Sequence, residues 1–96
     1  MTEYRLNPAA ERDLANIWRY TKAQWGREQA NRYTHALRTA CAELAKAPLQ
    51  AEGCAHIRPG YRRRSVERHI VYFRPTSYGI AIIRILHGRM DVGRHL

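Results

Sequence analysis

The chain has 96 residues, which is enough for one small domain with one core, so we expect residues 1–96 to form a single domain. Seventeen Lys and Arg against eight Asp and Glu give a net charge of +9, and fifteen of the cations are Arg. Such a charge favours an acidic partner, either a nucleic acid or a protein with an acidic face. A GC-rich genome also enriches Arg, so the charge alone excludes little.

Two features that the sequence lacks bear on the cellular location of the protein. The longest nearly apolar run, from Ile80 to Leu86, is interrupted by Arg84 and is far shorter than the about 20 residues of a membrane span. Residues 1–5 contain no apolar segment of the kind that signal peptides carry. We therefore expect a cytoplasmic protein that makes no contact with membranes.

The two cysteines, Cys41 and Cys54, form no CxxC pair, and no His stands at zinc-ligand spacing from them. In a cytosolic protein such thiols are usually reduced and structural. We expect neither a metal ion nor a cofactor.

The first element in chain order is a short strand over residues 3–6, because Tyr4 and Leu6 alternate onto one face. Asn7-Pro8 then starts a helix: Asn is a good N-cap, and Pro is well tolerated at the first helical position. The helix continues to Gly26 with apolar and aromatic residues at steps of three and four. These are Leu14, Ile17, Trp18, Thr21 and Trp25.

A second helix is predicted from Arg27 to just before Pro48, again from helical spacing of its apolar residues. The link at Gly26 is so short that the two helices must fold back on each other as an antiparallel hairpin. The simplest reading of the aromatic residues of this hairpin is packing within it, although part of their surface could serve a partner.

After a polar connection the period of the pattern drops to two, which predicts strands over residues 61–66, 69–74 and 80–86. Their short turns require antiparallel neighbours. The last strand is apolar on both faces, which is typical of a central strand covered on both sides. The predicted fold is therefore α+β with the order β-α-α-β-β-β, a helical hairpin packed on an antiparallel sheet.

The positive charge is concentrated in the sheet half of the chain. Residues after 48 include nine cations and only three acids, and so carry +6 of the +9. We expect many of the strand arginines to lie on the sheet face away from the helices, where they would meet solvent or a partner. These arginines are Arg62, Arg63, Arg64, Arg74 and Arg84.

No catalytic motif stands out: the sequence contains no HExxH, no P-loop, no paired carboxylates and no nucleophile elbow. The tail, residues 86–96, is unusual because it brings two Arg, two His and an Asp to the edge of the sheet. It also contains Met90, Val92 and Leu96, which a wholly solvated terminus would not need. The tail is therefore either a solvated end or a segment that binds a partner.

A series of residues across nearly the whole chain resembles the ParE toxins of the ParE/RelE superfamily of bacterial type II toxin–antitoxin systems. The matching residues are Asn7-Pro8-Ala9-Ala10, Asp13-Leu14, Ile17-Trp18, Tyr20, Trp25-Gly26, Gln29-Ala30, Tyr33, Pro48, Pro59-Gly60-Tyr61-Arg62, His69-Ile70-Val71-Tyr72-Phe73-Arg74, Ile82-Ile83-Arg84-Ile85-Leu86-His87, Met90-Asp91 and Arg94-His95-Leu96.

The resemblance implies a toxin that does no covalent chemistry and poisons DNA gyrase by trapping it on cleaved DNA. It also implies a cognate ParD-type antitoxin, a ribbon-helix-helix protein whose C-terminal segment folds around the toxin. The partners would be this antitoxin, gyrase and the DNA that gyrase holds. The ParE/RelE-like fold that it implies has the element order predicted above.

Two other functions stay open. RelE-like toxins of the same superfamily are ribosome-dependent mRNA endoribonucleases that use sheet-borne cations and an aromatic residue near the C-terminus. Here Leu96 follows His95, and Lys is nearly absent, so an obvious platform for stacking a base is missing. A plain basic module that binds DNA or RNA is the third reading.

These arguments give two sets of candidate binding residues and no catalytic residue. The set predicted to contact the target is Arg89, Met90, Arg94, His95 and Leu96 in the tail, with Arg64 and Arg74 on the sheet. The set predicted to contact the antitoxin through the hairpin is Trp18, Trp25, Tyr33 and Leu37.

Overall fold

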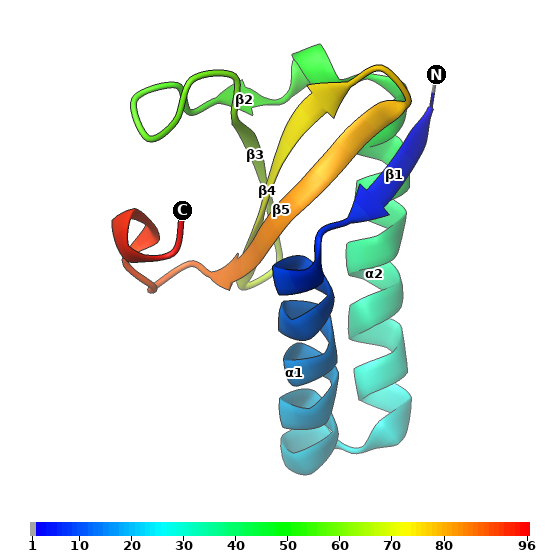
Figure 1. Cartoon of the computed structure of the whole chain (residues 1–96). Coiled ribbons are helices and arrows are strands. Elements are labelled where there is room, and N and C mark those ends of the chain that lie inside the picture. The colour runs from blue at the N-terminus through cyan, green and yellow to red at the C-terminus, as the bar shows by residue number, and fades with distance from the viewer. Residues whose placement is uncertain (1) are drawn as a thin grey trace.

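The computed structural model describes residues 2–96 and confirms the predicted α+β fold (Figure 1). The elements in chain order are β1 (Glu3–Leu6), α1 (Pro8–Trp25), α2 (Arg27–Lys46), β2 (Glu52–Gly53), β3 (Arg62–Val66), β4 (His69–Thr76) and β5 (Gly79–His87). Two single-turn 3-10 helices, η1 (Pro48–Gln50) and η2 (Val92–Arg94), complete the chain. The two-residue strand β2 was not predicted, because it lies in the polar connection that has no period-two pattern.

The five strands form one sheet in the order β1-β5-β4-β3-β2. Strands β2 to β5 are antiparallel to their neighbours, as the short turns require, whereas β1 runs parallel to β5. The sheet is therefore mixed, and the prediction of a wholly antiparallel sheet was wrong for this one pair. The short-turn argument does not apply to β1, because most of the chain separates it from β5.

Strand β1 lies very close to the start of β5. Gly79 is opposite Glu3 and has φ +142°, and a Cβ atom placed on it would lie 1.9 Å from the Glu3 carbonyl oxygen. Only glycine fits this position, so the glycine of the β4–β5 turn also creates the space in which the first strand pairs.

The start of α1 is tied to the sheet through Asn7. This residue occupies the predicted N-cap position, but its side chain makes no capping hydrogen bond. Its backbone N–H instead donates to the Ile82 carbonyl at 3.0 Å, while its carbonyl accepts the first helical bond from Glu11. Pro8 follows at the first helical position, as predicted. The cap is therefore a backbone link between α1 and β5.

The sheet is covered on both faces, as the apolar pattern of β5 predicts. The helical hairpin packs on one face over the main core, which includes Leu14, Leu37, Phe73 and Ile82. The loop before β3 and the tail fold over the opposite face (Figure 1). There a second, smaller cluster contains Cys54, Tyr72 and Leu86, with Ile57, Tyr61, Ile70, Val92 and Leu96 packed against it.

Strand β5 changes register in its middle, where Tyr72 pairs with Arg84 and Phe73 pairs with Ile82. The extra residue, Ile83, is a bulge of the kind that re-aims the side chains that follow it. Beyond the bulge, Ile85 joins the main core and Leu86 joins the smaller cluster. Arg84 lies between the bulge residue Ile83 and Ile85, beyond the point where β1 has ended.

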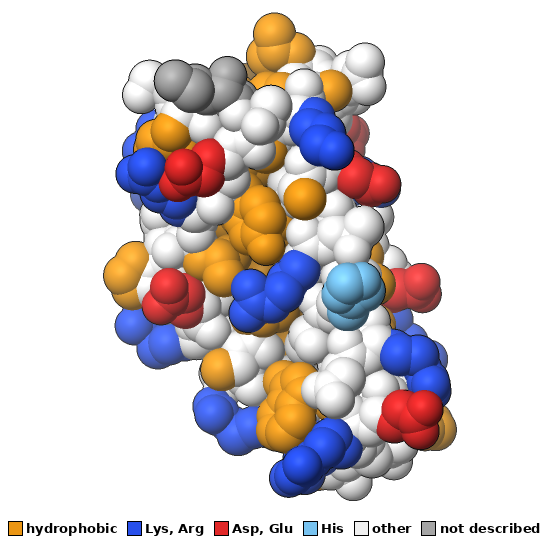
Figure 2. All heavy atoms as spheres, turned by 90° about the vertical axis from the view of Figure 1, so that its right-hand side faces the viewer, with side chains coloured by type: hydrophobic (Ala, Val, Ile, Leu, Met, Phe, Trp, Pro, Cys, Tyr) orange, Lys and Arg blue, Asp and Glu red, His pale blue; other side chains and the backbone are white. Residues whose placement is uncertain are grey.

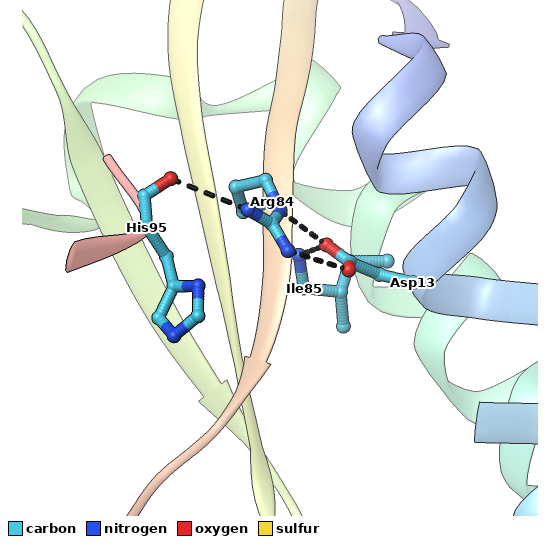
Figure 3. Close-up of polar contacts among 4 residues, drawn as sticks. All are labelled: Asp13, Arg84, Ile85 and His95. Carbon is cyan, nitrogen blue, oxygen red and sulfur yellow. Dashed lines mark hydrogen bonds and ion pairs between the residues drawn. The ribbon is translucent and has the colours of Figure 1, made fainter. Parts of the chain in front are cut away.

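Beyond the end of β1, the edge of β5 is contacted by Asp13 of α1 instead of by a strand (Figure 3). Its carboxylate accepts the backbone N–H of Ile85 at 3.0 Å and two guanidinium N–H groups of Arg84 at 2.7 and 2.8 Å. Arg84 also donates to the His95 carbonyl of the tail at 3.3 Å. The side chains of Asp13 and Arg84 are only 12% and 22% exposed, so the prediction that the strand arginines face solvent was wrong for Arg84.

Replacing Asp13 with Asn is predicted to lower the free energy of unfolding by about 2–3 kcal/mol, because it leaves the half-buried Arg84 cation without its counter-charge. Urea denaturation at neutral pH measures the effect. The matched control is Glu28→Gln, which removes an exposed pair with Arg32 on α2 and is expected to cost less than about 0.5 kcal/mol. A loss from Asp13→Asn as small as that of the control would contradict the role given to this carboxylate.

Candidate binding surfaces

The tail, of which residues 88–96 follow β5, is a folded part of the domain. Val92 and Leu96 pack against the smaller cluster on the sheet face that the helices do not cover. Of the predicted target-contacting residues in the tail, Arg89, Met90 and Arg94 are exposed, whereas His95 and Leu96 are half-buried. Met90 is one of the few large apolar side chains on the surface, at 41% exposed. The tail therefore presents one apolar and two cationic side chains on a fixed backbone.

Three polar contacts fix the shape of the tail. The Asp91 carboxylate accepts the Gly93 N–H at 3.1 Å and so starts the turn of η2. Arg84 holds the His95 carbonyl, as described above, and Arg58 donates through Nε and Nη2 to the Leu96 backbone oxygen at 3.1 and 2.8 Å. Arg58 was not among the predicted residues, because no local pattern connects a loop arginine with a segment 38 residues later.

The two predicted sheet arginines lie on different faces. Arg64 points toward the helices and forms an ion pair with Glu43 of α2 at 3.1 Å, so it does not share a surface with the tail. Arg74 is exposed, forms no ion pair within residues 2–96, and follows Phe73, which faces the main core. Since side chains alternate along a strand, Arg74 lies on the same sheet face as the tail. The structure thus places Arg74, but not Arg64, on the tail side of the sheet, where Arg74 pairs with Ala81, toward the end of β4 that is distant from the start of the tail.

Most of the other strand arginines are also engaged within the protein. Arg63 donates to the Glu52 carboxylate at 2.9 Å, and this hydrogen bond raises the pKa of Arg63 and lowers that of Glu52. Arg62 donates to the Ala51 carbonyl at 2.8 Å. These two cations hold β3 against the segment before it. Most of the strand arginines that were expected to face solvent or a partner therefore form contacts within the protein.

An open hollow of about 380 Å³ lies on the outer side of the helical hairpin. Its lining is mixed apolar and polar, and includes Leu6, Glu11, Leu14, Ala15, Trp18, Thr34 and Arg38. Figure 2 shows the corresponding face of the molecule, where hydrophobic side chains form a broken band with both basic and acidic side chains on either side. This is a shape that accepts an amphipathic segment.

Trp18 and Trp25 belong to this side of the hairpin. The Trp18 indole N–H donates to the Asn31 side chain at 2.8 Å, which fixes the ring at the junction of α1 and α2. Trp25 lies two helical turns further along the same stripe of α1 and is 70% exposed. The stripe therefore extends the apolar surface from the hollow to the tip of the hairpin.

Tyr33 and Leu37, the other two residues predicted to contact an antitoxin, face the sheet instead. Leu37 is 1% exposed and belongs to the main core, so it offers no surface to a partner. Tyr33 packs at the edge of the same core, and its hydroxyl lies 2.6 Å from Nδ1 of His69. Helical spacing placed all four residues in apolar stripes but could not tell which stripe faces the sheet.

Tyr33 belongs to a network with two histidines at the end of the sheet. Its hydroxyl accepts the Arg68 backbone N–H at 3.2 Å and has its own proton to donate to His69. The His69 ring meets His87 edge-on, with ring centroids 5.4 Å apart. Burial, reinforced by the facing His87, lowers the pKa of His69, whereas burial raises the pKa of Tyr33. The network therefore favours a neutral His69.

The described residues contain no evident catalytic or metal-binding constellation. Within residues 2–96 there is no group of three or more His, Cys, Asp or Glu that could hold a metal ion, and no helix is long and apolar enough to cross a membrane. Cys41 and Cys54 are buried and unpaired by a disulfide, and burial raises the pKa of Cys41 to about 11. Burial also raises the pKa of Cys54, so the protonated form of both thiols is favoured near neutral pH.

The lowered pKa of His69 predicts that the protein loses stability in mild acid. The unfolded chain binds a proton near the ordinary pKa of about 6.5, and the folded chain binds it only at lower pH, so the contribution is present above that value and is lost as the pH falls through it. We expect the free energy of unfolding to fall less between about pH 7.5 and 5.5 in His69→Gln than in the wild type. Urea denaturation at several pH values measures this difference.

The control for that experiment is His35→Gln, which changes an exposed histidine on α2. This variant should keep the pH dependence of the wild type. An identical pH dependence in the His69 variant and the wild type would show that the network does not suppress protonation of His69.

The sequence and the fold both match one family. The family described as "ParE toxin of type II toxin-antitoxin system, parDE" matches residues 4–92. A solved structure titled "Chromosomal ParDE TA system from P. aeruginosa" superposes with a TM-score of 0.78, covering 91% of this chain and 96% of that one. Its sequence identity is 24%, so this likeness supports the fold alone.

The curated relatives extend the match to full length. "Toxin ParE1" of Mycobacterium tuberculosis is 42% identical over 96 residues, covering 99% of this chain and 98% of the relative. "Toxin ParE1" of Caulobacter vibrioides is 36% identical, with 100% and 99% covered, and "Toxin ParE" of Escherichia coli is 37% identical, with 96% and 90% covered. The resemblance seen in the sequence is thus confirmed, and the chain belongs to the ParE toxin family of type II toxin–antitoxin systems.

Proposed function

We propose that this protein is a toxin that poisons DNA gyrase by stabilising its complex with cleaved DNA, without covalent chemistry of its own. The observation that carries the proposal is the folded tail, which presents Arg89, Met90 and Arg94 on a fixed backbone. Arg and Met are enriched in protein interfaces, and a preordered segment binds with a smaller entropic cost than a free one. Arg74 is exposed on the same sheet face, and its guanidinium suits an acidic protein face or DNA phosphates.

The arginines on either side of Tyr72, in the middle of the sheet, disfavour the ribonuclease alternative. A nuclease of this size would need cations free to bind a phosphate, next to a general base and a general acid. Arg84 and Arg63 are instead held by Asp13 and Glu52, and Tyr72 between them is 3% exposed. A toxin of the binding type needs none of these groups to be free.

A purified gyrase reaction with plasmid DNA tests the target. The wild-type protein should convert supercoiled plasmid to linear DNA once the reaction is stopped with detergent and protease. The double variant Arg89→Gln/Arg94→Gln should need at least about tenfold more protein for the same amount of linear DNA, because it loses two interface cations. The charge-matched control is Arg12→Gln/Arg27→Gln, which alters exposed arginines on the helices and should act like the wild type.

Two outcomes would contradict this function. One is a wild-type protein that produces no linear DNA at any concentration. The other is cleavage of mRNA in a translating extract while gyrase is unaffected, which would favour the ribonuclease.

The hollow on the hairpin is the place that we assign to the antitoxin, a ParD-type partner with an acidic, amphipathic helical segment. The hollow is partly apolar, its charged lining residues are Arg38 and Glu11, and the Lys22 ammonium lies 5.2 Å from the centre of the Trp18 ring. The net charge of +9 adds long-range attraction for an acidic segment. Trp18 and Trp25 supply the aromatic surface on which such a helix can pack.

Replacing Ala15 in the hollow with Glu tests this assignment, because it places a like charge under an acidic helix while keeping a good helix former at an exposed position. The affinity for a cognate ParD-type antitoxin, measured by calorimetry, should fall at least about 100-fold. The control Gln24→Glu adds the same charge on the opposite side of α1. Equal affinities of the two variants would place the antitoxin elsewhere.

A further inference from the structure

The loop before β3 is held in one shape by its own backbone. The Cys54 N–H donates to the Tyr61 carbonyl at 2.9 Å, and the Tyr61 N–H returns to the Arg58 carbonyl at 3.2 Å. The backbone N–H groups of Ile57 and Arg58 both donate to the Cys54 carbonyl. The Cys54 side chain itself is fully buried. Arg58 therefore projects from a closed turn that is fastened to the sheet.

The loop and the tail share the same apolar support. Ile57 and Tyr61 of the loop pack against the smaller cluster on which Val92 and Leu96 of the tail also pack. The Arg58 guanidinium bridges the two segments through its two N–H groups on the Leu96 backbone oxygen. A planar guanidinium that uses two donors fixes direction as well as distance, which a flexible ammonium does not.

We propose that Arg58 is a positioning residue for the target-binding surface, rather than a residue that contacts the target. It holds the end of the tail on the loop, and through the turn of η2 it fixes the directions in which Met90 and Arg94 leave the backbone. Without it, the last residues keep the Arg84 contact at 3.3 Å and the bonds of their own turn to the Val92 carbonyl. This inference rests on the proposed function, because it assigns the tail a target.

Two variants at this position and one control separate positioning from mere charge. Arg58→Gln removes the paired donors, Arg58→Lys keeps the charge with a single flexible donor group, and Arg27→Gln removes an exposed charge from α2. Amide exchange of His95 and Leu96, measured by NMR, reports the order of the tail, because both amides donate to the Val92 carbonyl. The gyrase reaction reports the activity, and antitoxin affinity reports the integrity of the hairpin.

For Arg58→Gln we expect about tenfold faster exchange of the His95 and Leu96 amides, from the loss of a charge-assisted contact. About tenfold more protein should be needed for half-maximal linear DNA. Antitoxin affinity should be unchanged, because the hollow lies on the other side of the sheet. Arg58→Lys should recover part of both losses, and Arg27→Gln should match the wild type in every measurement.

The outcomes of this experiment distinguish the inference from the function on which it rests. Unchanged amide exchange in Arg58→Gln overturns the inference, and so does faster exchange with undiminished gyrase poisoning. If the wild type and Arg27→Gln also fail to produce linear DNA, the proposed function is overturned, and the positioning role falls with it. The exchange rates would still show in that case whether Arg58 anchors the tail.

Discussion

The contact between Asp13 and Arg84 is the interaction on which the rest of this small domain depends. Strand β1 ends opposite Ile82, and a bulge follows at once, so the next stretch of β5 has no strand on that edge, while β4 still pairs with its other edge. A carboxylate from α1 fills that position by accepting one backbone N–H and two guanidinium N–H groups. Arg84 then reaches the tail through the His95 carbonyl. One half-buried ion pair therefore connects the hairpin, the central strand and the last residues.

The same ion pair illustrates how this protein uses its many arginines. Charge counting placed +6 of the +9 in the sheet half and suggested a broad cationic surface. In the structure, Arg62, Arg63, Arg64 and Arg84 are engaged by carboxylates or carbonyls of other segments of the chain. Arg74, Arg89 and Arg94 are exposed, and of these Arg94 lies 3.7 Å from the nearby Asp91 carboxylate. The candidate surface thus contains fewer arginines than the net charge implies, and one of the engaged arginines, Arg84, holds the tail through the His95 carbonyl.

The sequence predicted the elements of the fold because periodicity and turn residues are local signals: Pro8, Gly26 and Pro48 delimit the helices as expected. It could not predict the parallel pairing of β1, since that depends on the space beside Gly79. The sequence also wrongly predicted Leu37 as an antitoxin contact and Arg64 as a target contact. The spacing of residues along a helix or strand does not show which element each face packs against. The contact made by Arg58 could not be predicted for the same reason, since its hydrogen-bond partner, Leu96, is distant in sequence. Which residues form the candidate surface depends on contacts between segments that are distant in sequence, and residue type alone does not reveal these contacts.

A double-mutant cycle between Asp13 and Arg84 tests the central claim most directly. The free energy of unfolding would be measured for the wild type, Asp13→Asn, Arg84→Met and the double variant. If the pair organises the domain, the two single losses are strongly non-additive, with a coupling free energy of about 2 kcal/mol or more. A coupling below about 0.5 kcal/mol, as for exposed ion pairs, would contradict the account.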